Sequence, residues 1–388
     1  MNAMKSFGRH SLILISAMLF FACQTQITPV EDESDLLIDK EATAETKALY
    51  KNLKELAQTK VLYGHQDDLA YGYSWWAESG RSDVKEVTGS YPAVYGWDVG
   101  DIRQIDKTTN LDNIEWDNMK RWIKEGYERG GIITISWHMN HPVTDGNTWD
   151  KTPAVAAIIP GGEQHEKFKG WLDVFADFVS DLKGESGEAI PVIFRPYHEH
   201  TGSWFWWGEE QTSVEDYITL WRFTVEYLRD EKGIHNLLYA YSPDNQAGRE
   251  FSNYMNKYPG DDYVDVLGMD DYGSMNGRDP SEFSNELAWL VEEAEKRNKI
   301  AALSETGVEA IPDPLWWSNQ VIPSFTNNPK AKGIAYILTW RNANYEREQR
   351  DHFYASHPGH DSAPDMKTFR DHELFVFEDE LPDLYSLN

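Results

Sequence analysis

The chain contains the continuous segment Pro191-Val192-Ile193-Phe194-Arg195-Pro196-Tyr197-His198-Glu199-His200-Thr201-Gly202-Ser203-Trp204-Phe205-Trp206-Trp207-Gly208. Its first four residues form a short apolar run, which is typical of a buried strand. An arginine, two histidines, one glutamate and three tryptophans follow the strand directly. A folding core does not need this mixture at a strand end, because each buried charge or imidazole must find a partner. The segment predicts a strand that ends in a functional site; the alternative is a core strand followed by an aromatic-rich loop.

Seven further apolar runs of similar length are spread along the chain, each bounded by turn residues. They are Val61–Tyr63, Ala93–Trp97, Ile132–Trp137, Leu237–Tyr241, Val264–Met269, Ile300–Leu303 and Gly333–Leu338. Longer stretches with helical spacing lie between them, at Asn113–Arg129, Glu166–Leu182, Val214–Asp230 and Pro280–Arg297. In the last of these, Phe283, Leu287, Leu290, Val291 and Ala294 form one apolar stripe.

Eight successive strand-then-helix units predict an α/β fold, a (β/α)8 TIM barrel that forms a single catalytic domain over residues 41–388. A doubly wound open sheet is the alternative. It fits less well, because Gly64-His65-Gln66 follows the first strand where a glycine-rich phosphate loop would be expected.

Active-site residues of such barrels lie at the carboxyl ends of the strands. Glu199 follows the fourth strand and Glu305 follows the seventh, so the two carboxyl groups are expected to face each other across the barrel mouth. Most other strand ends also carry ionisable or aromatic residues, where simple turns would be expected if packing alone mattered. They are His65, Asp98, His138, Tyr241, Asp270 and Trp340.

Two carboxyl groups held in opposite protonation states are what glycoside cleavage requires. Glu199 lies among aromatic rings and histidines, where desolvation favours the neutral acid. Glu305 is expected to stay ionised beside Arg195 or the Tyr272 hydroxyl. Tryptophan faces match the C–H faces of sugar rings, and the chain has 16 tryptophans. The structural alternative is that each glutamate only forms an ion pair with Arg195 or Arg341.

At these residues the chain resembles glycoside hydrolase family 26, a family of retaining (β/α)8 glycosidases. The segments Arg195–Gly208 and Leu303-Ser304-Glu305-Thr306-Gly307 are similar to its two active-site signatures. The likeness continues in Trp137-His138, in Asp270-Asp271-Tyr272-Gly273 and in Trp340-Arg341-Asn342, and it covers about residues 41–388. The resemblance implies an endo-β-1,4-mannanase that needs no cofactor and acts on β-mannan or manno-oligosaccharides by double displacement.

The resemblance also implies roles for single residues. Glu199 corresponds to the acid/base and Glu305 to the nucleophile. The residues that correspond to substrate contacts are His138, Trp149, His198, Trp204, Asp270, Tyr272, Trp340 and Arg341. A mannobiose-releasing exo-mannanase and a β-1,3/1,4-glucanase of the same family remain alternatives, as does a non-catalytic sugar-binding lipoprotein. His138-x-x-His141 and His198-x-His200 leave a metal hydrolase open, although no metal is expected.

The amino-terminal residues and the overall charge bear on location and partners. Residues 1–23 combine Lys5 and Arg9 with a short apolar run that ends at Cys23, the only cysteine, and they predict a lipoprotein-type signal peptide. Residues 24–40 read as a flexible acidic tether. We expect an exported monomer that is lipid-anchored at a bacterial outer membrane, or otherwise secreted or periplasmic. The net charge of −29 argues against nucleic-acid binding, which needs basic patches.

Overall fold

The computed structural model describes Met1 and residues 37–102, 107–245 and 253–387. Residues 2–23 of the expected signal peptide, with Cys23, and residues 24–36 of the expected tether lie outside the described residues. Residues 37–40 are described, and they differ from a free tether. Leu37 and Asp39 are buried, and Asp39 accepts a hydrogen bond from His235 at 2.8 Å. The folded domain therefore includes residue 37, four positions before the predicted boundary.

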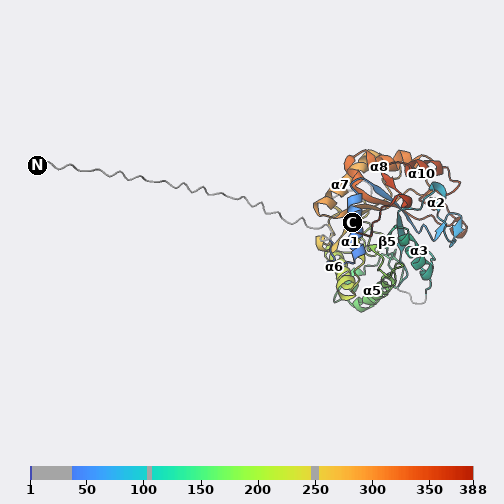
Figure 1. Ribbon diagram of the computed structural model, residues 1–388. Helices are drawn as coiled ribbons and strands as arrows, with labels where there is room; N and C mark the ends of the chain where they lie inside the picture. The colour runs from blue at the N-terminus through green and yellow to red at the C-terminus, as the bar shows by residue number, and fades with distance from the viewer. Residues whose placement is uncertain (2–36, 103–106, 246–252, 388) are drawn as a thin grey trace. The chain divides into compact units, whose positions relative to one another are not determined.

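Eight parallel strands form a closed barrel (Figure 1). They are β1 (Val61–Gln66), β4 (Val94–Asp98), β5 (Ile132–Ser136), β6 (Val192–Arg195), β7 (Leu237–Tyr241), β8 (Val266–Asp271), β9 (Ile300–Thr306) and β10 (Ile334–Thr339). Each strand pairs with the next in chain order, and β10 returns to pair with β1. Every residue of these strands is buried, as expected for parallel strands covered on both faces. The predicted (β/α)8 TIM barrel is confirmed.

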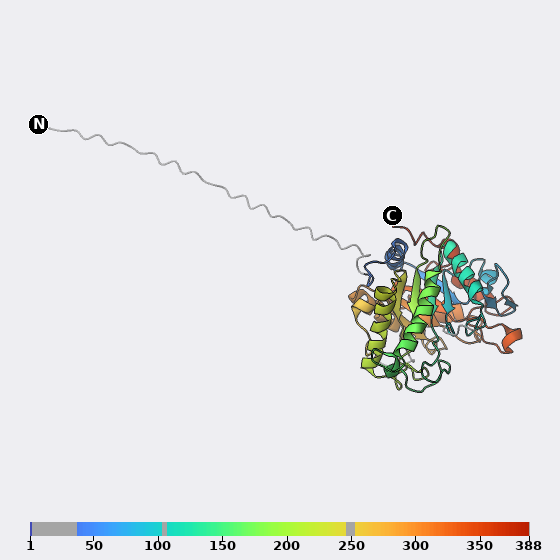
Figure 2. The ribbon, with the colours of Figure 1, turned by 90° about the horizontal axis from the view of Figure 1, so that it is seen from below.

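Helices surround the strands, and each of the four segments predicted as helical contains a long helix. These helices are α3 (Trp116–Glu128), α5 (His165–Ser180), α6 (Val214–Glu226) and α7 (Pro280–Lys296). Figure 2 shows α5 and α6, green and yellow-green, side by side on the barrel. The ring is completed by α2 (Asp83–Thr88), α8 (Ile322–Thr326) and α10 (Ala363–Arg370).

Helix α7 shows why these segments fold as they do. Asp279 caps its first turn by accepting a hydrogen bond from the Ser281 backbone N–H, and Pro280 occupies a starting position that needs no donor. All five residues of its predicted apolar stripe are buried. Burying each large apolar side chain stabilises the fold by about 1.5–3 kcal/mol, so the stripe holds α7 against the barrel.

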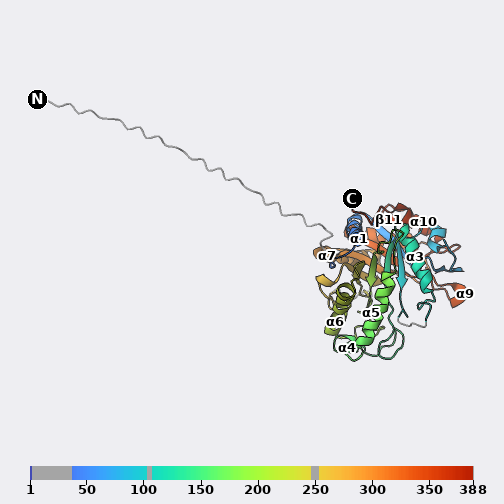
Figure 3. The ribbon, with the colours of Figure 1, turned by 60° about the horizontal axis from the view of Figure 1, so that its bottom comes forward.

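Several elements were not predicted from the sequence. They are α1 (Ala44–Leu56), the hairpin of β2 (Tyr71–Gly72) and β3 (Trp75–Trp76), α4 (Val155–Ile158), α9 (Tyr345–Glu348) and β11 (Phe375–Val376), which pairs with the start of β1. Short 3-10 or π-helical turns occur at Tyr227–Glu231, Asp261–Tyr263, Trp317–Val321, Pro329–Gly333 and Glu378–Glu380. Figure 3 shows α1 and β11 at one end of the barrel and α4 at the end to which the strand arrows point.

The barrel interior changes from apolar to polar along the strands. Leu62, Ile193, Leu238 and Val266 belong to one buried cluster with Leu49 and Leu53 of α1, so this helix closes the amino end of the barrel. Arg195 lies two residues after Ile193 on β6, and Asp270 lies four residues after Val266 on β8. An even spacing places each pair on the same face of its strand. The apolar layer thus supports a polar layer at the carboxyl ends. No helix in the described part of the chain is long and apolar enough to cross a bilayer.

Candidate active site

A cleft of about 360 Å³ lies at the carboxyl ends of the strands, and both glutamates line it. Glu305 belongs to β9, and Glu199 lies in the loop after β6. Of the other predicted contacts, His138, Trp149, Trp204, Tyr272, Trp340 and Arg341 line the same cleft. Residues from several strand ends and loops therefore meet at one opening, as the strand-end pattern predicted.

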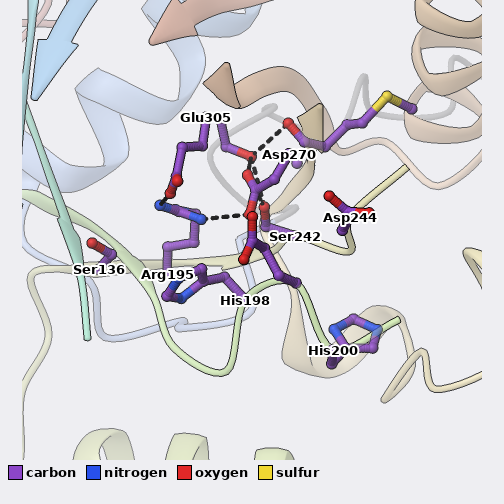
Figure 4. Close-up of polar contacts among 12 residues, drawn as sticks. Ser136, Arg195, His198, His200, Ser242, Asp244, Asp270 and Glu305 are labelled. Carbon is purple, nitrogen blue, oxygen red and sulfur yellow. Dashed lines mark hydrogen bonds and ion pairs between the residues drawn. The ribbon is translucent and has the colours of Figure 1, made fainter. Parts of the chain in front are cut away.

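Glu305 is held by two donors. Arg195 donates from its Nη2 to Oε2 of Glu305 (Figure 4). The Tyr272 hydroxyl donates to Oε1 at 2.6 Å. Both carboxylate oxygens are thus engaged by groups that stabilise negative charge. Because Glu305 is almost fully buried, this pairing also fixes the direction in which its carboxylate points.

Arg195 is itself fixed by a second carboxylate beneath the cleft. Its Nη1 donates to Oδ2 of Asp270 at 2.6 Å, and the other oxygen of Asp270 accepts from Ser242 at 2.6 Å and from Ser304 at 2.8 Å. The guanidinium therefore lies between two carboxylates with all three groups buried. Losing one partner would leave an unpaired buried charge, which costs about 3–5 kcal/mol in such networks.

Glu199 has the opposite environment. Burial, followed by the negative charges of Glu305 and Asp270, raises the pKa of its carboxyl group well above the ordinary value. The Trp204 indole N–H donates to its Oε2 at 2.7 Å and opposes this only in part. The backbone of Glu199 is left-handed, with φ at 54°, and its N–H donates to the Ser242 carbonyl at 2.8 Å. A non-glycine residue in this conformation is strained, and the surrounding loop must hold it in place.

The loop that carries Glu199 has a close contact that only glycine permits. A Cβ atom on Gly202 would overlap the six-membered ring of Trp204. The absence of a side chain at Gly202 thus lets the indole fold back over the loop and reach Glu199. Trp204 is half-buried, so part of its ring faces the cleft.

His138 lines the cleft with its ring orientation fixed by Asp98 at the end of β4. Its Nδ1 lies 2.8 Å from Oδ2 of Asp98, and its backbone N–H donates to the same carboxylate. Burial alone would lower the pKa of His138, but Asp98 and then Glu305 raise it overall. The rings of Trp149 and Trp340 lie 5.7 Å and 5.9 Å from the imidazole. The sequence marks Asp98 only as a strand-end acid, and its contact with His138 in the barrel gives it a positioning role.

Two predicted contacts lie below the cleft surface. His198 and Asp270 are both fully buried and are not part of the cleft lining. The His198 ring packs at 4.6 Å from His138 and 5.3 Å from Phe205, and neither of its nitrogens has a hydrogen-bond partner in the described part of the chain. Burial, with Arg195 and His138 nearby, lowers its pKa well below the ordinary value, so its ring is neutral. The structure supports a packing role for His198, and its contact with a substrate stays a prediction.

Five further lining residues were not predicted: Leu111, Asp112, Phe205, Arg350 and His352. Asp112 comes from the loop after β4 and lies 3.3 Å from Arg341. Arg341 also pairs with Glu348 at 2.6 Å, which in turn accepts from Arg350 at 2.8 Å. These loops are far apart in sequence. No pattern in the sequence around Asp112 marks it as a cleft residue, because it lies well beyond the end of β4.

Of the four histidines that left a metal site open, His138, His141 and His200 have other hydrogen-bond partners. His141 lies 2.8 Å from the Thr152 carbonyl, and its second nitrogen accepts from backbone N–H groups. His200 lies between the hydroxyls of Tyr217 and Tyr241, each at 2.9 Å. Over residues 37–102, 107–245 and 253–387, no three His, Cys, Asp or Glu side chains are grouped to hold a metal ion.

Comparison with known proteins shows which protein family the chain matches. The profile described as "Glycosyl hydrolase family 26" matches residues 38–355. A "Mannan endo-1,4-beta-mannosidase" of Bifidobacterium adolescentis is 36% identical over 353 residues, which are 86% of this chain. This chain spans only 34% of that relative's length.

Solved structures agree with the sequence match. A GH26 beta-mannanase from Bacteroides ovatus superposes with a TM-score of 0.83 at 44% identity, over 89% of this chain and 98% of that one. A GH26C protein from Muricauda sp. MAR_2010_75 gives a TM-score of 0.84 at 32% identity, over 92% of this chain and 98% of that one.

Proposed function

The chain belongs to glycosyl hydrolase family 26, and on that basis we propose that it is an endo-β-1,4-mannanase acting on mannan, galactomannan or glucomannan. The single observation that carries the proposal is the contrast between Glu199 and Glu305 in one cleft. One carboxyl group has a raised pKa, and the other is bound by a guanidinium and a phenol. A retaining glycosidase requires this pair of states.

In the proposed reaction, the Glu305 carboxylate attacks the anomeric carbon while Glu199 gives its proton to the leaving oxygen. A covalent glycosyl-enzyme forms, and Glu199, now ionised, takes a proton from water. The water oxygen attacks the anomeric carbon, the bond to Glu305 breaks, and the product keeps its anomeric configuration. Tyr272 and Arg195 stabilise the carboxylate that Glu305 regains in this last step.

The cleft walls support a sugar chain as the substrate. Trp149, Trp204 and Trp340 each expose part of an indole to the cleft, and His138, Asp112 and Arg341 supply polar groups between them. Aromatic faces with a few placed polar groups suit sugar rings, which have apolar C–H faces and polar edges. The mannanase names of the relatives favour β-mannan over other polysaccharides.

The proposal is tested by incubating the full chain with β-mannan, galactomannan, glucomannan, mixed-linkage β-glucan and β-1,3-xylan, and sizing the products. We expect a broad range of manno-oligosaccharides early in the reaction and β-anomers in the first NMR spectra. Release of mannobiose alone would instead support the exo-acting alternative. Cleavage of β-glucan alone, loss of activity with a chelator, or inverted anomers would overturn the proposed substrate or mechanism.

We also propose that the enzyme is a monomer anchored by lipid at Cys23 to a bacterial outer membrane. The support is the sequence alone: a lone cysteine preceded by Ala22 after a short apolar run. An anchored endo-acting enzyme would shorten polymer close to the cell surface, where its products can be taken up.

A further inference from the structure

A second cavity, which we call the side pocket, lies next to the active-site cleft and takes no part in the proposed reaction. Its volume is about 280 Å³. Trp122 lies in its lining, and the other residues that supply polar and aromatic groups are Trp76, Thr109, Asn113, Glu115, Asn118 and Arg347. They come from the β2–β3 hairpin, the loop before α3 with the first turn of that helix, and α9.

One loop separates the side pocket from the cleft. Leu111 and Asp112 line the cleft, whereas Thr109 and Asn113 of the same loop line the side pocket. A second connection runs through side chains. The Arg341 guanidinium, in the cleft, lies 5.9 Å from the Tyr71 ring, and Tyr71 stacks on Trp76 at 4.8 Å with the rings nearly parallel. A polymer that fills the Arg341 end of the cleft is therefore one loop away from the side pocket.

Arg347 is the most unusual group in the side pocket. Its guanidinium lies 3.9 Å over the Trp76 ring, on an exposed residue of α9. Its backbone N–H donates to Oδ1 of Asn344 at 3.2 Å, but the guanidinium itself forms no hydrogen bond or ion pair with a side chain in the described ranges, although the chain carries a net charge of −29. Stacking on the indole holds the guanidinium plane in place and leaves its five N–H donors free.

Complementary acceptors and donors lie around the same cavity. The Glu115 carboxylate accepts a single hydrogen bond within the described residues, from Asn118 at 3.0 Å, and so has lone pairs to spare. Asn113 adds an exposed side-chain amide. The lining thus carries one positive and one negative side chain together with amides, and its formal charge sums to zero. This combination suits a neutral ligand with many hydroxyl groups, and the carboxylate disfavours phosphate or a uronic acid.

From this geometry we propose that the side pocket is an accessory binding site for one neutral pyranose unit of the polysaccharide. The proposal rests on the proposed function, because that function supplies the polymer. Arg347 donates to two neighbouring hydroxyls, and Glu115 accepts from a third. The bound unit is a hexosyl residue either of the main chain beyond the cleft or of a galactosyl branch, since both present the same hydroxyl-rich chemistry.

The test compares Arg347→Ala with a matched control, Arg81→Ala. Arg81 also lies over a tryptophan of the hairpin, at 5.3 Å from the Trp75 ring, but it is paired with Glu86 and lines neither cavity. KM and kcat are measured on unbranched β-mannan, on galactomannan and on mannotetraose. We expect Arg347→Ala to raise KM on polymer about tenfold with kcat unchanged. A change of this size corresponds to the loss of hydrogen bonds to a charged group. Mannotetraose kinetics and the Arg81→Ala variant should match the wild type.

The outcomes separate the two sources of the sugar. A KM increase on both polymers identifies a main-chain unit, and an increase on galactomannan alone identifies a branch. Glu115→Gln serves as the second variant and should raise KM on the same substrates. Equal changes on mannotetraose and polymer, or no change with either variant, would overturn the accessory site.

A failure of the proposed function would be visible separately. If the wild type cleaves none of the mannans, the substrate assignment is wrong, and migration is then measured in native gels containing galactomannan, glucomannan or β-glucan. Retardation that is lost in Arg347→Ala and kept in Arg81→Ala still supports the side pocket. Retardation that is equal in all three proteins, or absent from all, contradicts it.

Discussion

At the scale of single residues, Glu199 and Glu305 show how one side chain serves two purposes. Glu305 receives a guanidinium and a phenol, both of which favour its charged form. Glu199 receives one indole N–H, and burial and nearby carboxylates disfavour its charge. These partners support the proposed roles of Glu199 as acid/base and Glu305 as nucleophile, independently of any relative.

Substitution of each glutamate should separate the two steps of the reaction. Glu199→Ala should still form the glycosyl-enzyme from dinitrophenyl glycosides, because that leaving group needs no proton, while activity on mannan falls about 10²–10⁴-fold. Azide should then restore turnover and give a β-glycosyl azide. Glu305→Ala should form no covalent intermediate. Mass spectrometry of the intermediate and NMR of the azide product check this, and a retained azide product from Glu305→Ala would reverse the two roles.

The raised pKa of Glu199 also predicts how stability depends on pH. Unfolded, the carboxyl group titrates near 4.5, whereas in the folded protein it keeps its proton to a higher pH. Below the unfolded pKa the carboxyl group is protonated in both the folded and the unfolded protein, so it does not change the free energy of unfolding. As the pH rises towards the folded value, only the unfolded state gains by ionising, so the wild type loses stability.

Glu199→Gln removes that loss, because the amide stays neutral in both states. The Tm of Glu199→Gln minus that of the wild type should be close to zero near pH 4, about where the unfolded carboxyl group begins to ionise, and should grow as the pH is raised through neutrality. Thermal denaturation over this range measures the difference. A constant difference at all pH values would mean that Glu199 is not protonated in the folded protein.

At the scale of elements, the loop after β6 shows how backbone geometry positions Glu199, the proposed acid. Gly202→Ala should displace the Trp204 ring, since the new methyl group would overlap it, and the hydrogen bond to Glu199 should be lost. We expect kcat/KM on mannan to fall about 10²-fold, as small displacements of catalytic groups commonly cause.

The matched control for this substitution is Gly170→Ala in α5. A Cβ atom at Gly170 would have no neighbouring atom within 4 Å, and the residue is in a helix interior. Alanine there should stabilise the fold by about 0.5–1 kcal/mol without changing kinetics. Enzyme assays and thermal denaturation of both variants make the comparison. Unchanged kinetics in Gly202→Ala would show that Trp204 does not need its observed position.

The barrel strands and the four long helices could be predicted because each carries its signal locally. An apolar run such as Ile132–Trp137, which contains β5, or a stripe such as that of α7 reflects burial by the neighbouring element. Helix α1 and strand β11 could not be predicted in the same way. Helix α1 comes before the first strand, outside the repeating strand-then-helix pattern, and β11 has only two residues. In the folded chain α1 contacts β7 and β10, and β11 pairs with β1.

At the scale of the whole molecule, the site was predictable wherever a strand end supplied the residue. Glu199, Glu305, His138 and Arg341 lie at or just after strand ends, and the closed barrel brings those ends together. Asp112, Arg350 and Arg347 could not be placed. They lie on loops or, for Arg347, on the short helix α9, and these segments meet through ion pairs and stacking across the rim. The sequence thus specifies the centre of the cleft better than its edges.

The last prediction concerns where the enzyme acts. Cys23 lies outside the described residues, and among the described residues those that line the cleft all lie beyond position 110. Cys23→Ala should therefore leave kcat/KM on soluble galactomannan unchanged. If Cys23 carries lipid, the same substitution should move the protein from the membrane fraction to the soluble fraction, because acyl chains anchor by burying methylenes at about 0.8 kcal/mol each. Fractionation and labelling with a fatty acid measure this, and Ser11→Ala in the same segment is the control. Membrane association that persists in Cys23→Ala, with no label on the wild type, would contradict the anchor and leave the proposed mannanase activity intact.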